Sequence, residues 1–155
     1  MPTQVMFYLL NDEKADADTE IDSAMYHACL QASYFYRQNQ RVYIYSEDQH
    51  HAEQIDEMLW AFDCDSFVPH NLVGEGPIKG AMVEIGHSVP KGRRSVLINL
   101  NAKVPNFANQ FQYIVDFVPS NAELKQQARE RFKTCRQWGF SVDNQKAVDP
   151  NKASQ

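Results

Sequence analysis

The chain has few cysteines and no long apolar run. Cys29, Cys64 and Cys135 are too few and too far apart for a disulfide framework or for the paired spacing of a zinc site. No apolar stretch approaches the about 20 residues that cross a bilayer. The N-terminus has neither the basic region nor the small-residue cleavage site of a signal peptide. We therefore expect a soluble, cytoplasmic protein without a structural metal.

Motifs for catalysis and for nucleotide binding are also missing. The sequence GEGP, residues 74–77, lacks the lysine–hydroxyl pair of a P-loop and the G-x-G-x-x-G spacing, so it predicts a turn. His50 and His51 are adjacent, so on a helix they cannot clamp one metal ion as an i, i+4 pair can. No Ser/His/Asp or Cys/His combination is evident. The sequence thus predicts no catalytic residue, no cofactor and no metal ligand.

Length and composition favour one globular domain. The 155 residues are 43% hydrophobic and 12% aromatic, enough for a single hydrophobic core. We place the domain at residues 1–140 and interpret residues 141–155 as a polar C-terminal extension that is flexible at its end. The net charge of −5 argues against general binding of duplex DNA, which depends on many phosphate contacts.

Short apolar runs alternate with helical patterns along the chain. Five runs predict buried strands, at residues 5–10, 41–46, 82–86, 95–100 and 113–118. Helical periodicity is found at residues 21–36, 52–62 and 120–138. This alternation predicts an α/β fold of three layers, α/β/α, with a mostly parallel, Rossmann-like central sheet and helices on both faces.

The predicted helices have candidate caps. The N-terminal caps are predicted at Thr19 with Asp22, at Ser46 with Gln49 and at Ser120 with Glu123. Gly139 is a natural stop for the last helix. The segment SFVPHNLVGEGP, residues 66–77, is predicted to be a loop because it contains two prolines and two glycines.

The predicted last helix concentrates positive charge in an acidic chain. The segment LKQQARERFKTCRQWGF, residues 124–140, holds five of the 15 basic residues and a single acidic residue, Glu130. These five are Lys125, Arg129, Arg131, Lys133 and Arg136. A local basic patch on an acidic protein suggests a small anionic target rather than a nucleic-acid duplex.

A helical wheel places most of these cations beside an aromatic ring. At about 100° per residue, one stripe roughly 60° wide holds four side chains, and Lys133 lies next to it. The four are Lys125, Arg129, Phe132 and Arg136. The neighbouring stripe, predicted to face the core, holds Leu124, Ala128 and Cys135.

Phe132 lies at the seam between the two stripes, so it is predicted to be an apolar ring flanked by cations. Such a face suits a peptide that ends in an aromatic residue and a free carboxylate. Arginine can hold that carboxylate through charged hydrogen bonds of roughly 1.5–3 kcal/mol each. The alternative is a solvated helix face whose cations merely complement the helix dipole.

Several motifs resemble one protein family. They occur in the order FYLL, LW, SFVPHNLVGEGP, VEI, VDFVP, LKQQARERFK and GF, and they span roughly residues 5 to 140. The chain resembles the chi subunit of bacterial DNA polymerase III holoenzyme. The resemblance implies a replication accessory protein without chemistry of its own, within a DNA-directed DNA polymerase. It implies no cofactor, no membrane contact and only indirect contact with DNA.

The resemblance also implies two partners. In the family, chi binds the acidic, phenylalanine-ended C-terminal tail of single-stranded DNA-binding protein (SSB), and it pairs with the psi subunit, which tethers it to the clamp loader. The residues of the tail site that carry over are Lys125, Arg129, Phe132 and Arg136, with Val118 lining the pocket and Lys133 beside it. The family often has tyrosine at Phe132, so the apolar contact is the one expected to be kept.

The psi-facing side is suggested by Trp60 and Phe67. On the wheel, Trp60 lies more than about 100° from the centre of the apolar stripe of its helix, so we expect it to be exposed. An exposed tryptophan is a typical interface anchor. The alternatives are that Trp60 folds back under the following loop and that Phe67 belongs to the core.

Two functions of other classes compete with this interpretation. An α/β fold can be a nucleotide-dependent enzyme that uses the ends of its strands, although no phosphate-binding motif supports one. The basic helix could instead bind single-stranded DNA directly, although one aromatic residue among five cations is a poor platform for stacking bases.

Overall fold

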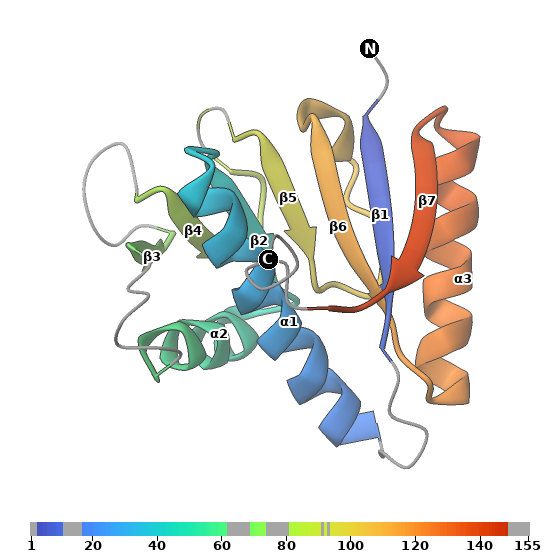
Figure 1. Cartoon of the computed structure of the whole chain (residues 1–155), viewed down its shortest axis with the longest axis horizontal. Coiled ribbons are helices and arrows are strands. Elements are labelled where there is room, and N and C mark those ends of the chain that lie inside the picture. The colour runs from blue at the N-terminus through green and yellow to red at the C-terminus, as the bar shows by residue number, and fades with distance from the viewer. Residues whose placement is uncertain are drawn as a thin grey trace.

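A seven-stranded parallel sheet forms the middle layer in the computed structural model, which describes residues 3–10, 17–61, 69–73, 81–90, 92 and 94–148. The strands are β1 (Gln4–Leu9), β2 (Val42–Tyr45), β3 (His70–Leu72), β4 (Val83–Gly86), β5 (Val96–Asn99), β6 (Tyr113–Val118) and β7 (Ser141–Lys146). The helices are α1 (Ala17–Arg37), α2 (Gln49–Ala61) and α3 (Ala122–Gln137), with the short 3-10 helix η2 (Ala108–Gln110) (Figure 1).

The strand order is β3-β4-β2-β5-β6-β1-β7, and every neighbouring pair is parallel. Parallel strands need crossover connections, which here are long enough to hold the helices. The sheet is buried on both faces in its middle, so all four residues of β4 and of β5 are buried. The prediction of an α/β fold with a mostly parallel sheet is confirmed, and the sheet is wholly parallel.

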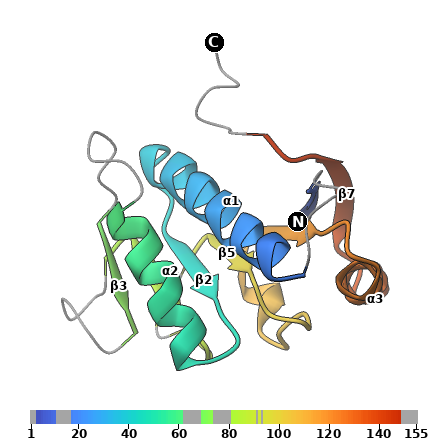
Figure 2. The same ribbon diagram turned by 90° about the horizontal axis from the view of Figure 1, so that it is seen from below.

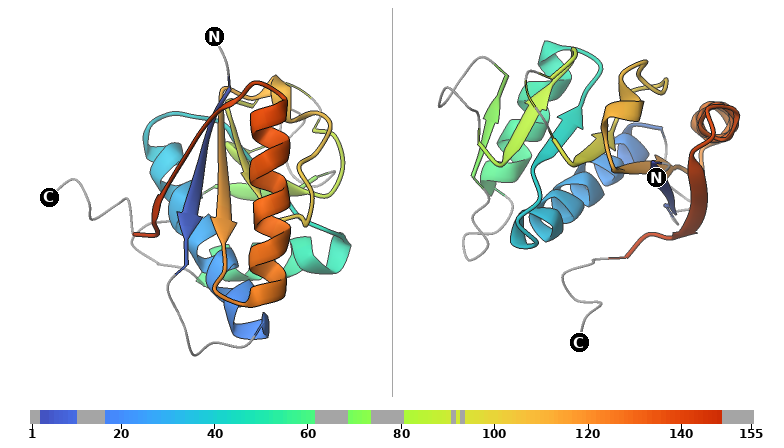
Figure 3. Two further views of the ribbon diagram at one scale, coloured as in Figure 1. Left: turned by 90° about the vertical axis from the view of Figure 1, so that its right-hand side faces the viewer. Right: turned by 90° about the horizontal axis from the view of Figure 1, so that it is seen from above.

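Helices cover the two faces of the sheet separately. The right panel of Figure 3, which looks along the strands, shows α1 on one side of the sheet and α3 on the other. Figure 2 gives the same arrangement from the opposite end, with α3 seen almost end-on. The three predicted layers are therefore present.

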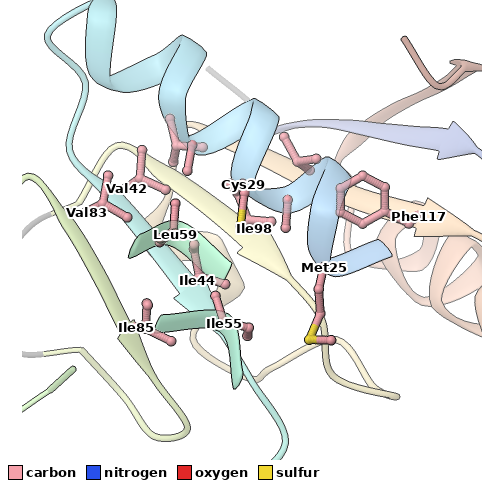
Figure 4. Close-up of a cluster of buried hydrophobic side chains, with 14 of the residues drawn as sticks. Met25, Cys29, Val42, Ile44, Ile55, Leu59, Val83, Ile85, Ile98 and Phe117 are labelled. Atoms are coloured by element: carbon pink, nitrogen blue, oxygen red, sulfur yellow. The ribbon is translucent and has the colours of Figure 1, made fainter. Parts of the chain in front are cut away.

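Each layer of helices seals its own hydrophobic core. On the face of α1 and α2, Ile44 and Ile98 from the sheet pack with Met25 and Ile55 from the helices (Figure 4). On the other face, Phe7 belongs to a second cluster that includes Cys135 of α3 and Phe107 next to η2. Burial of these apolar side chains, at roughly 25 cal/mol per Å², holds the helices against the sheet.

Two strands escape prediction from the sequence. β3 lies inside the segment predicted as a loop, although its last two residues are buried. Its Asn71 side chain accepts a hydrogen bond from Ala81 N–H at 2.6 Å and donates one to Glu84 at 3.3 Å. Glu84 in turn pairs with Arg94 at 3.2 Å, so polar contacts stabilise this short strand where an apolar run is missing.

β7 is the second missed strand. Its sequence, SVDNQK, is almost entirely exposed, so burial gives no signal. It is an edge strand that pairs along its whole length with β1, and polar edges are common because they limit pairing with other molecules. The boundary that we placed at residue 140 therefore falls before the last strand of the sheet. The end of the predicted extension, beyond residue 148, lies outside the described residues.

The predicted helix starts are shifted, whereas the predicted stop is correct. α1 already runs from Ala17, so Thr19 lies within the helix. α2 is capped by Asp48, whose Oδ1 accepts the His51 N–H at 2.8 Å, whereas Ser46 is buried and donates to the Gly86 carbonyl.

The last helix shows a one-residue shift of its cap. Asn121 caps α3 by accepting from the N–H groups of Glu123 and Leu124, while the Ser120 hydroxyl donates to the Leu10 carbonyl. Gly139 takes the positive φ of 83° that favours glycine, and the helix ends there as predicted.

Among the described residues, none of the helices is long and apolar enough to cross a membrane.

Candidate functional site

α3 presents three kinds of surface. Its inner surface is formed by Ala128, Arg131 and Cys135, which are buried against the sheet, with Leu124 half-buried beside them. As predicted, Cys135 is a buried apolar residue, and burial raises the pKa of its thiol to about 12, so it stays protonated. The outer surface is solvated, and Phe132 lies half-buried between the two.

The outer surface gathers the predicted cations. We call it the basic face of α3 and define it as Lys125, Arg129, Phe132, Lys133 and Arg136. All four of its cations are exposed. Val118, the remaining predicted residue of the site, is half-buried at the end of β6 and packs on the same core cluster as Phe132. The helix therefore presents its cations to solvent on either side of an apolar ring.

The Phe132 ring packs on a core residue on one side and has a cation on its solvent side. Its centroid lies 5.2 Å from that of Phe7, a fully buried residue of β1, at an interplanar angle of 53°. The guanidinium carbon of Arg136 lies 5.9 Å from the Phe132 centroid, which is within cation–π range. The ring thus packs on the core and has a cation beside it, in agreement with the apolar ring flanked by cations that the wheel predicted.

Lys133 differs from the other cations of the basic face. Its Nζ lies 3.8 Å from Glu130 Oε1, and both side chains are largely exposed. Such a surface pair contributes little to stability, but it offsets part of the positive charge at this point. Lys133 is therefore the weakest of the cations as a ligand for an anion.

Arg131 does not belong to the basic face, although the sequence groups it with the other cations. Its Nε donates to both carboxylate oxygens of Asp116, at 2.9 and 3.2 Å, and both side chains are buried. Its terminal nitrogens donate to the carbonyls of Ala102 and Phe117. This arginine joins α3 to the sheet and cannot bind an external ligand without breaking that network.

The buried carboxyl group of Asp116 explains why the Arg131 side chain is buried between α3 and the sheet. Burial raises the pKa of its carboxyl group, while Arg131 and the hydrogen bonds from Phe117 N–H and Asn99 act to lower it. A lone buried carboxylate would be costly, so Arg131 serves as its partner. This pair is not predictable from the sequence pattern because the two residues are 15 positions apart on different elements.

Trp60 marks a second exposed aromatic site, near the end of α2, a helix that lies at the opposite end of the domain from α3 (Figure 1). Its side chain is 63% exposed at the end of α2, so the expectation of an exposed tryptophan is confirmed. The ring packs edge-on against His70 of β3, with centroids 5.0 Å apart. His70 Nε2 lies 3.3 Å from Asp56 Oδ1, so the imidazole links the helix to the strand. Phe67 lies outside the described residues.

Comparison with known proteins supplies the family. Residues 1–143 match the family model described as DNA polymerase III chi subunit, HolC. The chain belongs to this chi family. It is 44% identical to DNA polymerase III subunit chi of Escherichia coli over 140 residues, which cover 88% of this chain and 93% of that protein. The corresponding protein of Haemophilus influenzae is 38% identical over 148 residues, covering 93% of this chain and 99% of that one.

One solved structure has a similar fold. A crystal structure of T4 UvsW superposes with a TM-score of 0.60 at 11% sequence identity, over 94% of this chain and 41% of that one. At this identity the likeness concerns the fold alone. The family match and the fold together describe a chi-family subunit of DNA polymerase III with an α/β architecture.

The chi-family chain also has a cavity at the carboxyl ends of its strands, where α/β proteins often bind ligands. The cavity has a volume of about 290 Å³ and lies between the first turns of α2 and the inner side of α3. Glu47 and Asp48 line its rim, and its one arginine, Arg131, is already paired with Asp116. Carboxylates at the rim and a neutralised cation do not suit a phosphate, so the geometry does not favour a nucleotide site.

The described residues hold no group of three or more His, Cys, Asp and Glu side chains that could bind a metal ion. His51 is engaged locally, since its Nδ1 accepts the N–H of Glu47 at 3.2 Å. Burial lowers the pKa of the His51 imidazole, although the nearby Glu47 and Asp48 act to raise it. His70 contacts Asp56 and Trp60 of α2 and so links β3 to that helix.

Proposed function

We propose that this chi-family subunit is a non-catalytic bridge that holds the C-terminal tail of SSB at the basic face of α3 and the psi subunit at Trp60. Through psi it would connect template coated with SSB to the clamp loader of the DNA polymerase III holoenzyme. The proposal rests on one observation above the others, the exposed cations set around the half-buried ring of Phe132.

The chemistry of the basic face matches an acidic tail that ends in phenylalanine. The terminal carboxylate and the acidic side chains of the tail are anions, and Lys125, Arg129 and Arg136 are exposed cations that can meet them. The terminal aromatic ring can lie against Phe132 and Val118, the apolar part of the same surface. The match depends on the cations and the apolar contact together, since a surface with cations alone would bind any polyanion.

Trp60 provides the second contact of the bridge. A tryptophan that is 63% exposed offers a large apolar area, and its packing on His70 limits the rotamer entropy lost on binding. Because α2 and α3 lie at opposite ends of the domain, the two contacts can be made together (Figure 1). Once one contact is made, the second becomes effectively intramolecular, which raises the local concentration of the replication machinery on the coated template.

The tail site is tested by titrating an acidic peptide that ends in phenylalanine. We expect Arg129→Ala to weaken binding by about tenfold or more, the loss of one charged hydrogen-bonding group, with the unfolding midpoint unchanged. Gln137→Ala, at another exposed position of α3, is the control and should bind as the wild type does.

A second peptide with an amidated C-terminus sharpens this test. If Arg129 holds the terminal carboxylate, amidation and Arg129→Ala each weaken binding, and together they weaken it little further. Equal binding of the acidic peptide by Arg129→Ala and wild type would put the site elsewhere. A steep loss of affinity for bare oligonucleotide at rising salt would instead favour direct binding of single-stranded DNA.

The psi site is tested in the same way. We expect Trp60→Ala to weaken capture of purified psi while the affinity for the tail peptide stays the same. Trp138→Ala is a matched control, because Trp138 is 46% exposed but lies at the end of α3. Loss of psi binding in both variants would point to a general effect of removing tryptophan rather than to a site at Trp60.

A further inference from the structure

Trp60 stands in a strongly acidic part of the molecule. Residues 42–78 contain no lysine or arginine, and they contain eight carboxylates. Among the described residues of this stretch, Glu47, Asp48, Glu53 and Glu57 are exposed. Any partner that covers Trp60 therefore approaches through a negative potential that no lysine or arginine of this segment offsets.

Two of these carboxylates share a surface with Trp60. Glu53, Glu57 and Trp60 have i, i+4, i+7 spacing on α2, so they fall within a stripe roughly 60° wide. All three side chains are exposed. We call this surface the Trp60 face and define it as Glu53, Glu57 and Trp60.

Contacts within the fold are made both at the border of the Trp60 face and by one of its members. Asp56 lies on its border and pairs with His70, the residue on which the Trp60 ring packs. Glu53 accepts a hydrogen bond from the side-chain amide of Gln49 at 3.2 Å, one turn earlier, and this contact leaves its charge intact. Trp60 thus packs on His70, and the exposed side chains of Glu53 and Glu57 share its stripe of the helix.

We propose that the partner surface that covers Trp60 is cationic, a segment with lysine or arginine side chains that meet Glu53 and Glu57. An arginine of such a segment can also stack on the Trp60 ring, because a guanidinium is attracted to the face of an indole. The inference rests on the proposed function, in which psi is the partner at Trp60, and it adds the chemistry by which psi is recognised there.

The same charges direct the two partners to different helices. An acidic tail is attracted by the basic face of α3 and repelled by the Trp60 face, although both faces offer an aromatic ring. A cationic partner is attracted by the Trp60 face and repelled by the basic face of α3. The Trp60 face therefore selects its partner partly by rejecting the acidic tail.

The test compares binding of purified psi to the full chain and to the variant Glu53→Gln/Glu57→Gln at two salt concentrations. Each lost ion pair at an interface rim weakens binding by a few-fold at most, so we expect a loss of about three- to tenfold at low salt. The difference should shrink at high salt, because salt screens the wild-type attraction. Glu123→Gln/Glu130→Gln removes two exposed carboxylates from α3 and is the control for net charge.

The outcomes separate the inference from the proposed function. If the wild type binds psi and the Glu53→Gln/Glu57→Gln variant binds it with the same dissociation constant and salt dependence, the proposal of a cationic partner surface is wrong. The proposed function is not affected by that result. Failure of the wild type to bind psi would overturn the proposed partner and this inference with it.

A charge-reversed variant provides a second test. Glu53→Lys/Glu57→Lys should weaken the binding of psi further and create a second, weaker site for the acidic tail peptide. If the charge-reversed variant binds the tail peptide at one site only, as the wild type is expected to do, the proposed rejection of the tail by the Trp60 face is wrong.

Discussion

α2 and α3 carry the same arrangement of side chains with opposite charge. Glu53, Glu57 and Trp60 on α2 have the same spacing as Lys125, Arg129 and Phe132 on α3. Each set places two charges and one aromatic ring on a single stripe of its helix. The two helices pack on opposite faces of the sheet, toward its two ends (Figure 3).

The aromatic residues of the two helices differ in depth. Trp60 is 63% exposed and protrudes, so it can enter a pocket of a partner. Phe132 is half-buried on Phe7, so it can only receive a group laid against it. Under the proposed function, charge would decide which partner approaches each helix, and the depth of the ring would decide which side supplies the protruding group.

The largest effect is expected at Arg131, which lies on α3 but not on its basic face. Arg131→Leu leaves the buried Asp116 carboxylate without its partner, so we expect a loss of about 3–5 kcal/mol in the free energy of unfolding, measured with denaturant at neutral pH. Arg129→Leu, two positions away and exposed, should change stability by no more than about 0.5 kcal/mol. Equal losses in the two variants would contradict the division of α3 into a structural and a binding side.

The same pair predicts a pH dependence. Burial already holds the pKa of Asp116 above its ordinary value, and removal of Arg131, which acts to lower it, raises the pKa further. A carboxyl group with a raised pKa favours the folded state when it is protonated. The deficit of Arg131→Leu relative to wild type should therefore be smallest at acidic pH and grow as the pH rises through that pKa. Unfolding curves of both proteins between about pH 4 and pH 8 would measure it.

A second substitution provides the control for this interpretation. Asp116→Asn in the Arg131→Leu background removes the buried charge, so it should recover part of the lost stability and abolish the extra pH dependence. If the double variant keeps the pH dependence of Arg131→Leu, another group is responsible.

A graded effect is expected among the cations of the basic face. Arg136→Ala should weaken the tail peptide by about tenfold, because Arg136 lies beside the Phe132 ring and is exposed. Lys133→Ala should weaken it by no more than about threefold, because Glu130 already offsets the charge of Lys133. Calorimetric titration of the two variants under the same conditions tests the order, and the reverse order would contradict the geometry.

A small effect on stability is expected at the starts of the two helices, both of which use an Asx cap. Asp48→Ala and Asn121→Ala should each lower the free energy of unfolding by about 1 kcal/mol, since each removes a side-chain acceptor for helix N–H groups. Asn121→Asp keeps the acceptor and should be nearly neutral. If Asp48→Ala lowers the free energy of unfolding at low salt but not at high salt, the charge of Asp48, rather than its capping hydrogen bond, stabilises α2.

The apolar parts of the fold are predictable from the sequence, and the polar parts are not. The run YIVDFV is β6 with its bounds as predicted, because a strand buried on both faces is rich in apolar residues and here only Asp116 departs from that pattern. β7 and β3 are stabilised by backbone pairing and by polar contacts, which leave no periodic apolar pattern. The caps moved by one or two residues because Ser46 and Ser120 use their hydroxyl groups for contacts across the fold.

The candidate site divides in the same way. The wheel alone groups the basic face and puts Phe132 at the seam, since helical periodicity fixes which side chains share a stripe. It does not reveal that Arg131 has a buried partner, because Asp116 comes from another element. Nor does it reveal that His70 holds Trp60, since that contact joins α2 to a strand absent from the prediction.

The most direct test of the bridge is a titration of the tail peptide with and without saturating psi. If α2 and α3 bind separate partners, the dissociation constant of the peptide should be the same in both samples, and both partners should be found on one protein molecule. Displacement of the peptide by psi would contradict the account, because it would place both partners on one surface.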